Sequence, residues 1–600
     1  MSEISELIAT LRPPFDNDRL LRKKKSIKRQ LLEQDINWVE KKIAILTGST
    51  ANEIMDQLEI SLLSYGIKPS FYLSEYNKYF EDAVFGTPEL DEFAPDIVFI
   101  FTTSRNVLAW PNYACNDADC EELLNSQFMH LKQCWEALRA RYGCTIIQNN
   151  FDRPWYRLLG NKDIYDVHGK SNFIYKLNGK IYDYANTVDN FYINDIDYLA
   201  SSYGLANWHN FDMWYLYKYA LDLKAIPALA FNVANIIKAI YGKNKKAFAL
   251  DLDNTLWGGV ISEDGVNNIE IGNETQKAEA YKEFQEYISE HKNLGIVLTV
   301  DSKNDMEIAL EGLNHPDSTL TPNDFAVIKA NWEPKDVNLV EIAKDLNIGA
   351  DAIVFVDDNP FERNIVKSTL PDAGIPEVGE VGTFISTIDS QGYFETVSIT
   401  KEDIEKNQMF KEQTMRKQAE ATFTDYNKYL ESLNMVATIS DFAPEYLQRI
   451  AQLTNKSNQF NVTTKRYSQA EIDEVYNSDE YIRLAGRLED KFGDNGLVSV
   501  MIGKKKQQEL HMDLWIMSCR VLKRDFEYAM FDSLVEECRK QGIEKIVGYY
   551  YPTPKNSMVK NLYQSVGAVL RCEDADGNAV WNLDVSTYVN KNKVLNDIRR

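Results

Sequence analysis

Long apolar segments are missing from this 600-residue chain. No uninterrupted apolar run approaches the roughly 18 residues that a membrane helix needs. The N-terminal residues also lack the positive-then-apolar order of a secretory signal. These absences argue against a membrane protein or an exported one, and we expect a cytoplasmic location.

Cysteine and histidine are scarce. The 7 cysteines form no C-x-x-C pair, and the 6 histidines form no H-E-x-x-H pattern. The first absence argues against a disulfide framework or a structural zinc site, and the second argues against a zinc hydrolase. We expect reduced thiols.

Positive charge is in short supply as well. With 66 Lys and Arg against 90 Asp and Glu, the formal net charge is −24. Binding to nucleic acid or to an acidic membrane surface needs a basic face, so we expect neither partner. An anionic small substrate stays compatible with this charge, because a pocket can be locally basic or can hold a metal ion.

The length predicts several domains, since a single core rarely grows beyond about 300 residues. The fold class that we expect is α/β and multidomain. The pattern of strands and helices predicts an α/β domain over 1–240, a central domain over 245–390, a connecting helix over 400–434 and a third α/β domain over 435–590.

In the central block, strands AFAL, IVLTV and IVFV alternate with helical stretches. This order is typical of a doubly wound parallel sheet, in which the carboxyl ends of the strands meet at one edge. Acidic or polar residues follow each strand directly. They are Asp251, Asp253, Asp301, Ser302, Asp357 and Asp358.

Carboxylates gathered at one edge repel one another unless a cation lies among them. Oxygen ligands favour Mg²⁺, which also binds substrate phosphate. We therefore expect a magnesium site made by Asp251, Asp253, Asp357 and Asp358.

The same residues suit phosphoryl transfer. Asp251 would be the nucleophile that forms an aspartyl-phosphate, and Asp253 the general acid and base. Ser302, with Lys335 at the start of a predicted helix, would bind the phosphate oxygens. A lone D-x-D is usually a turn or a cap, so the prediction depends on the ordered set.

This ordered set resembles the haloacid-dehalogenase (HAD) phosphotransferase superfamily, whose four motifs occur in the same order. The runs ALDLDNTLWGGVISEDG, NWEPK and VFVDDNPFERN, with NKSNQFNVTTKRY and WIMSCRVLKR further on, are similar to the FkbH-like branch. The resemblance implies a Mg²⁺-dependent phosphatase that acts on a phosphorylated small metabolite. The intervals between the motifs are too short for a large cap domain.

FkbH-like proteins also imply an alternative, the transfer of a glyceryl group from 1,3-bisphosphoglycerate to an acyl carrier protein. In that family the residue before the S-K-N motif is commonly Cys, proposed to carry glyceryl as a thioester. Here it is Asp301, which cannot form a thioester. Asp301 could instead cap a helix that begins near Asn304. A further alternative is a non-catalytic scaffold in a biosynthetic complex.

The third block resembles the GNAT acyltransferase fold, in which a Q/R-x-x-G-x-G/A loop cradles a pyrophosphate. In the matching stretch, 520–525, Lys523 and Asp525 stand at the two glycine positions. We therefore expect acetyl-CoA to bind weakly or not at all. The polar stretches 455–466 and 492–496 are expected to be surface loops or contacts with a substrate or carrier protein.

The first block faintly resembles SGNH hydrolases. Ser49 follows one predicted strand, and Gln148-Asn149-Asn150 follows another. One hypothesis is an active pair of Ser49 and His209. The other is that Ser49 and Thr50 cap the next helix and His209 is structural.

Overall fold

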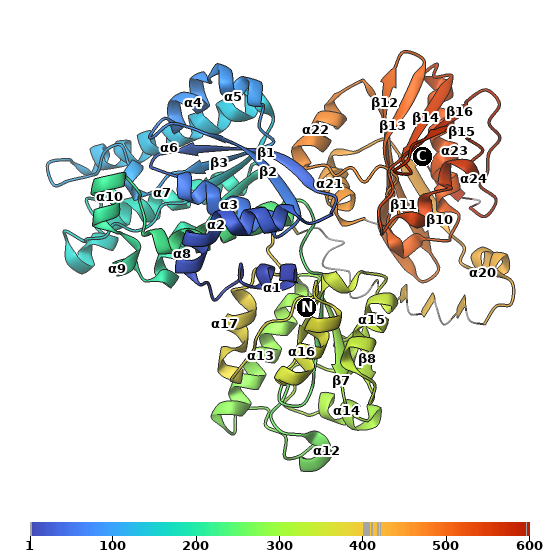
Figure 1. The fold of residues 1–600 in the computed structure, drawn as a ribbon, viewed down its shortest axis with the longest axis horizontal. Helices are drawn as coiled ribbons and strands as arrows, with labels where there is room; N and C mark the ends of the chain where they lie inside the picture. The colour runs from blue at the N-terminus through green and yellow to red at the C-terminus, as the bar shows by residue number, and fades with distance from the viewer. Residues whose placement is uncertain are drawn as a thin grey trace. The chain divides into compact units, whose positions relative to one another are not determined.

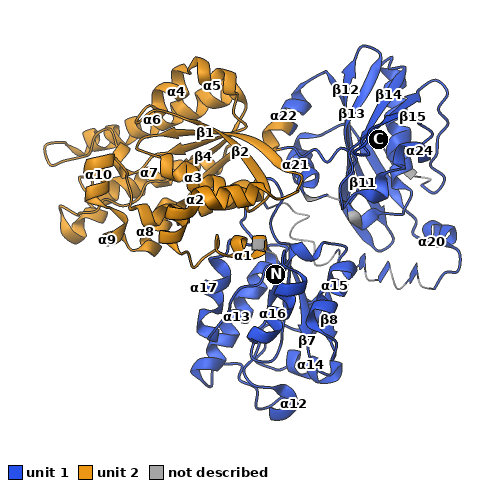
Figure 2. Ribbon diagram, viewed as in Figure 1, with its two compact units in different colours: residues 1, 241–467, 472–600 blue, residues 2–240, 468–471 orange. Residues whose placement is uncertain are grey.

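The computed structural model describes residues 3–399, 409, 412–413, 415–416, 419–420, 422–457, 459–595 and 597–599. Much of the predicted connecting helix over 400–434 lies outside these residues. Figure 2 shows two compact units. One runs to residue 240 and takes in 468–471, and the other holds 241–467 and 472–600. The predicted domain limits stay predictions.

Five parallel strands form the sheet of the first unit, in the order β2-β1-β3-β4-β5. Figure 1 labels β1, β2 and β3 of this sheet. Strand β3 reads IVFIF and is buried throughout, as expected where helices cover both faces of a parallel sheet. The strands are β1 (Val39–Thr47), β2 (Ile67–Leu73), β3 (Ile97–Phe101), β4 (Thr145–Asn149) and β5 (Phe191–Asn194). The helices are α1 (Glu3–Ala9), α2 (Asn17–Leu32), α3 (Asn52–Leu63), α4 (Tyr79–Phe85), α5 (Pro88–Phe93), α6 (Asp117–Tyr142), α7 (Lys170–Ala185), α8 (Ile196–Tyr203), α9 (Leu205–Trp208), α10 (Phe211–Tyr217) and α11 (Ile226–Ile240).

Within the described chain, one segment, Leu223–Ile240, is long and apolar enough to cross a membrane by length and composition alone. Lys224 and Lys238 interrupt its apolar run, and 67% of it is buried inside the protein. Most of this segment is helix α11, whose side chains belong largely to the core of the first unit.

The central sheet has four parallel strands in the order β8-β7-β6-β9, which confirms the predicted doubly wound sheet. The side chains of β6 alternate between two cores. Phe248 and Leu250 pack with α13, α14 and α17, whereas Ala247 and Ala249 pack with α15 and α16. The strands are β6 (Ala247–Leu250), β7 (Val297–Ser302), β8 (Val327–Ala330) and β9 (Ile353–Val356). The helices are α12 (Ile261–Asp264), α13 (Gln276–Asn293), α14 (Met306–Leu313), α15 (Lys335–Asp345), α16 (Pro360–Thr369) and α17 (Phe384–Asp389).

The third sheet is mixed and has eight strands in the order β15-β16-β14-β13-β12-β11-β10-β17. Its strands are β10 (Val436–Ser440), β11 (Tyr481–Asp490), β12 (Gly493–Lys506), β13 (Glu509–Met517), β14 (Lys545–Tyr550), β15 (Val569–Glu573), β16 (Ala579–Asp584) and β17 (Asp597–Arg599). The helices are α20 (Tyr426–Ser432), α21 (Leu447–Lys456), α22 (Gln469–Asn477), α23 (Phe526–Lys540) and α24 (Leu562–Ser565).

Strands β13 and β14 pair over only three residues each, Glu509 to His511 with Lys545 to Val547, and then diverge. The segment 460–463 lies between the diverging edges. The carbonyl of Phe460 accepts from Met517 N at 3.1 Å, and the carbonyl of Val462 accepts from Tyr551 N at 2.9 Å. The expectation of a surface loop is therefore wrong for this segment, because it satisfies backbone groups that the diverging strands leave free.

The loop before α23 keeps the backbone shape of a glycine loop without its glycines. Lys523 and Asp525 have φ angles of 62° and 59°, in the left-handed region that glycine adopts most readily. Between them, the Arg524 guanidinium turns inward and donates to Asp490 Oδ2 at 2.9 Å. Side chains thus surround a turn that would have to be bare to approach a pyrophosphate closely.

We predict that the full-length protein binds acetyl-CoA weakly or not at all. Side chains crowd the loop that would have to approach the pyrophosphate, and segment 460–463 fills the space between the diverging strands β13 and β14. Calorimetry with acetyl-CoA tests this, and the double variant K523G/D525G is the matched control. It should remain a non-binder because the strand edges stay occupied. Micromolar binding by the wild type would contradict the prediction.

Candidate active site

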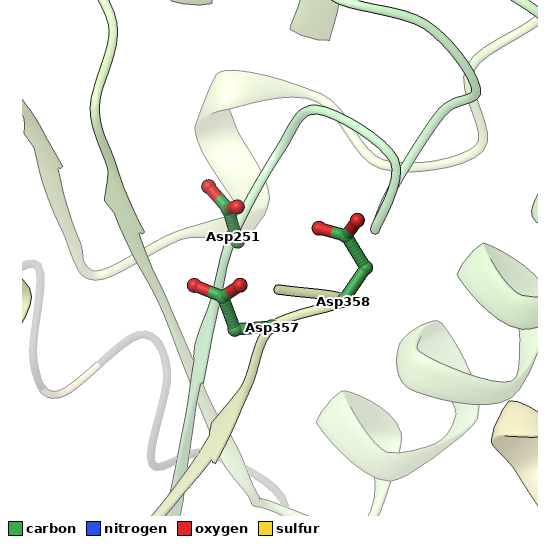
Figure 3. Close-up of side chains that lie close together, drawn as sticks. All are labelled: Asp251, Asp357 and Asp358. Carbon is green, nitrogen blue, oxygen red and sulfur yellow. The ribbon is translucent and has the colours of Figure 1, made fainter. Parts of the chain in front are cut away.

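Three carboxylates meet at the carboxyl edge of the central sheet. Asp251 directly follows β6, and Asp357 and Asp358 directly follow its neighbour β9. One carboxylate oxygen from each residue lies within 4.8 Å of the others. Figure 3 shows the three side chains turned toward a common space.

Main-chain hydrogen bonds hold the loops that carry these carboxylates. Asp251 N donates to the carbonyl of Val356 at 2.9 Å, which continues the strand pairing. Asp358 N donates to Thr255 Oγ1 at 3.2 Å. The Arg363 guanidinium donates to the carbonyls of Asp357 and Asp358, both at 2.7 Å. These hydrogen bonds fix the main chain from which the three carboxylates project.

Lys335 is the first residue of α15 and is buried. Its ammonium lies 2.8 Å from Asp251 Oδ2 and 2.5 Å from Asp357 Oδ2. Burial alone would lower the pKa of Lys335, but the two carboxylates outweigh it and raise that pKa. The predicted phosphate-binding lysine is thus beside the predicted nucleophile.

One ammonium does not balance three carboxylates. Burial and repulsion by Asp251 raise the pKa of Asp357 to about 6, although Lys335 opposes the shift. The same two causes raise the pKa of Asp358. Excess negative charge on closely spaced oxygens is what a hard divalent cation such as Mg²⁺ relieves.

The Asp253 carboxylate lies outside this cluster of three, and its predicted role as a metal ligand stays a prediction. Its Oδ1 accepts from Trp257 Nε1 at 2.9 Å and from Ile261 N at 3.2 Å, and its Oδ2 accepts from Asn304 Nδ2 at 2.8 Å. These donors hold the carboxylate away from the other three. Burial raises the pKa of Asp253 and outweighs these hydrogen bonds, which suits a group that must hold a proton.

Ser302 is the last residue of β7, the strand beside β6. It is buried, and its carbonyl accepts from Asn331 N at 3.1 Å. The structure therefore brings Ser302 to the same sheet edge as Asp251. Its role in phosphate binding stays a prediction.

Asp301 is fully buried, and burial raises its pKa to about 8. Its Oδ1 accepts from Asn338 Nδ2 at 3.1 Å. The alternative that Asp301 caps a helix is wrong, because α14 begins at Met306 and its N-cap residue is Asp305. Sequence reasoning missed Asn338, since nothing local marks it as a partner of a residue 37 positions away.

In the first unit, Ser49 is fully buried and its Oγ has no hydrogen-bond partner among the described residues. His209 Nε2 lies 3.0 Å from the carbonyl of Arg153. No hydrogen bond joins Ser49 to His209 in the part of the chain that the structure describes, so an active pair stays a hypothesis. The capping alternative is wrong, because the N-cap of α3 is Ala51 and Thr50 Oγ1 donates to the carbonyl of Tyr217.

Residues 42–238 match the family model described as the FkbH N-terminal domain. A search of curated proteins finds no match. Among solved structures, the chain is similar to the N-terminal part of the protein BF1531 from Bacteroides fragilis, which contains a phosphatase domain and was crystallised with Mg. The identity is 28% and the TM-score 0.58, over 63% of this chain and 99% of that chain.

Two acetyltransferases are more distant. The ribosomal-protein-S18-alanine N-acetyltransferase of Escherichia coli is 14% identical, with a TM-score of 0.21 over 26% of this chain and 99% of that chain. The spermidine/spermine N-acetyltransferase SpeG of Vibrio cholerae is also 14% identical, with a TM-score of 0.21 over 25% and 95%. The resemblance to FkbH-like proteins with a HAD-type phosphatase domain, drawn from the sequence motifs, is confirmed.

Proposed function

We propose that the central domain is a Mg²⁺-dependent phosphatase that acts on a phosphorylated small metabolite through an aspartyl-phosphate. The observation that supports it best is the cluster of Asp251, Asp357 and Asp358 around the buried ammonium of Lys335. The similar Bacteroides fragilis structure, crystallised with Mg, supports the choice of metal.

The chemistry needs two steps. A carboxylate oxygen of Asp251 attacks phosphorus, the bond from phosphorus to the substrate oxygen breaks, and Asp253 gives its proton to that leaving oxygen. Asp253, now ionised, takes a proton from water, whose oxygen attacks the aspartyl-phosphate. The bond between phosphorus and Asp251 breaks, and inorganic phosphate leaves with the carboxylate restored.

The remaining side chains stabilise charge and fix geometry. Lys335 neutralises oxygens of the phosphoryl group, and Ser302 donates to them. Asp251, Asp357 and Asp358 would hold Mg²⁺, which supplies positive charge to the phosphate when it is bound. Trp257, through its hydrogen bond to Asp253, keeps the acid oriented.

The FkbH match favours a second candidate, glyceryl transfer to an acyl carrier protein. The residue at the family's cysteine position is Asp301, which is buried and has no thiol. Of the cysteines whose exposure is described, Cys572 is exposed in β15 and Cys115 is half-buried in the first unit, so neither belongs to the central sheet. These observations favour hydrolysis over transfer. The complete set of charged residues argues against a scaffold without activity.

Asp251→Asn should lower phosphate release from an aryl phosphate by about 10³-fold or more while the protein stays folded, because an amide cannot form the aspartyl-phosphate. Asp253→Asn should also be severe, since it removes the proton donor. Phosphate release and circular dichroism would be measured together. The surface variant Asp317→Asn is the matched control, and turnover by Asp251→Asn within tenfold of wild type would refute the nucleophile.

Removing the metal should abolish turnover. EDTA should stop phosphate release, and added Mg²⁺ should restore it. Asp358→Ala should raise the Mg²⁺ concentration for half-maximal rate by about tenfold, with recovery at high Mg²⁺, because one of three carboxylate ligands is lost. A wild-type rate that EDTA leaves unchanged would contradict metal dependence.

With 1,3-bisphosphoglycerate, we expect phosphate release without a stable acyl-enzyme. Asp301 cannot carry a thioester, and an anhydride in its place would hydrolyse quickly. Intact-mass spectrometry after mixing checks this. A glyceryl adduct that hydroxylamine removes, and that maps to any cysteine, would instead support the transferase.

A further inference from the structure

A closed ring of hydrogen bonds joins the end of β7 to the first turn of α15. Asp301 Oδ1 accepts from Asn338 Nδ2 at 3.1 Å. Asn338 and Asn331 exchange two side-chain bonds, at 3.0 and 3.2 Å. Asn331 N then donates to the carbonyl of Ser302 at 3.1 Å, which returns to β7 beside Asp301.

This ring includes a residue of the same helix turn that carries Lys335, the proposed phosphate-binding lysine. Asn338 is three residues after Lys335, so both side chains leave the same face of α15. Both are buried. The N-terminus of α15 has no side-chain cap, because its N-cap residue is Pro334. The ring therefore fixes the first turn of α15 to strand β7. Lys335, whose ammonium contacts Asp251 and Asp357, belongs to this turn.

Packing alone would not favour an aspartate at position 301, which is fully buried. A fully buried carboxyl group costs free energy unless its surroundings compensate for its lost water. The carboxyl group of Asp301 accepts one hydrogen bond, at Oδ1, and its Oδ2 has no partner among the described residues. An apolar side chain at position 301 would be buried at a lower cost in free energy. The carboxyl group of Asp301 therefore matters because it accepts the hydrogen bond from Asn338.

We propose that Asp301 is a positioning residue for phosphoryl transfer. Through Asn338 it sets the first turn of α15 and hence the ammonium of Lys335, and through Asn331 it holds the main chain of Ser302. This inference rests on the proposed phosphatase function. It gives a role to a residue that does not itself take part in the two chemical steps.

The role predicts which substitutions matter. Asp301→Ala and Asn338→Ala each open the ring, so kcat/KM and the affinity for inorganic phosphate should each fall by about tenfold or more, since misplacing a binding group by about 1 Å is costly. Asp301→Asn keeps a carbonyl acceptor in the same place and should stay within about threefold of wild type. The double variant D301A/N338A should have a kcat/KM no lower than that of the more impaired single variant, because the ring acts as a unit.

Thr299→Val is the matched control. Thr299 is a buried residue of the same strand, two positions before Asp301, and its hydroxyl donates to the carbonyl of Phe248 at 2.8 Å. The change removes a buried hydrogen bond without touching the ring. It should lower the melting temperature and leave the kinetic constants and phosphate affinity unchanged.

The experiment measures phosphate release and calorimetric binding of inorganic phosphate for all five proteins and the wild type, each at saturating Mg²⁺. If Asp301→Asn is as impaired as Asp301→Ala, the ring does not position Lys335. The same follows if the losses of kcat/KM in the two alanine variants multiply in the double variant. The same conclusion holds if Thr299→Val reproduces the loss. Should Asp301→Ala fail to fold, Asn338→Ala and Asp301→Asn still decide the matter. A wild type that releases no phosphate would refute the proposed function, whereas the phosphate-binding series would still test the ring.

Discussion

The site depends on the electrostatic balance at one sheet edge, where the ammonium of Lys335 lies between Asp251 and Asp357. Parallel pairing of β6 with β9 forces the carboxylates together, because each follows its strand without an intervening residue. Their mutual repulsion would push the loops apart in the absence of positive charge. A buried lysine removes part of that repulsion, and the remainder favours a divalent cation.

The polar groups around the Lys335 ion pairs are explained by the same electrostatic balance. A buried ion pair is useful only if its partners are held in place, since an unmatched buried charge is costly. Arg363 fixes the carbonyls of Asp357 and Asp358, and Thr255 fixes the amide of Asp358. Asp253 lies two residues after Asp251 but faces Trp257 and Asn304. Adjacent positions in one motif thus obtain different environments, which separates a nucleophile from a proton donor.

In the third sheet, the local backbone resembles a ligand cradle while the packing around it does not. The turn at Lys523 and Asp525 has the dihedral angles of a glycine loop. Arg524 nevertheless turns toward Asp490, and segment 460–463 occupies the space between β13 and β14. A backbone shape is therefore a weak guide to binding when side chains and a neighbouring segment fill the volume that a ligand would need.

The sequence by itself determined three of the four strands of the central sheet, β6, β7 and β9, and the residues that end them, because apolar runs followed by Asp or Ser are local patterns. It therefore predicted Asp251, Asp357, Asp358, Ser302 and Lys335 at one edge. Only the tertiary structure decided that Asp253 leaves the carboxylate cluster, that Asp301 contacts Asn338 and caps no helix, and that segment 460–463 is buried. The reason is physical. The direction of a side chain and its hydrogen-bond partners are set by packing between segments that lie tens of residues apart, and no local pattern records which of these segments come together.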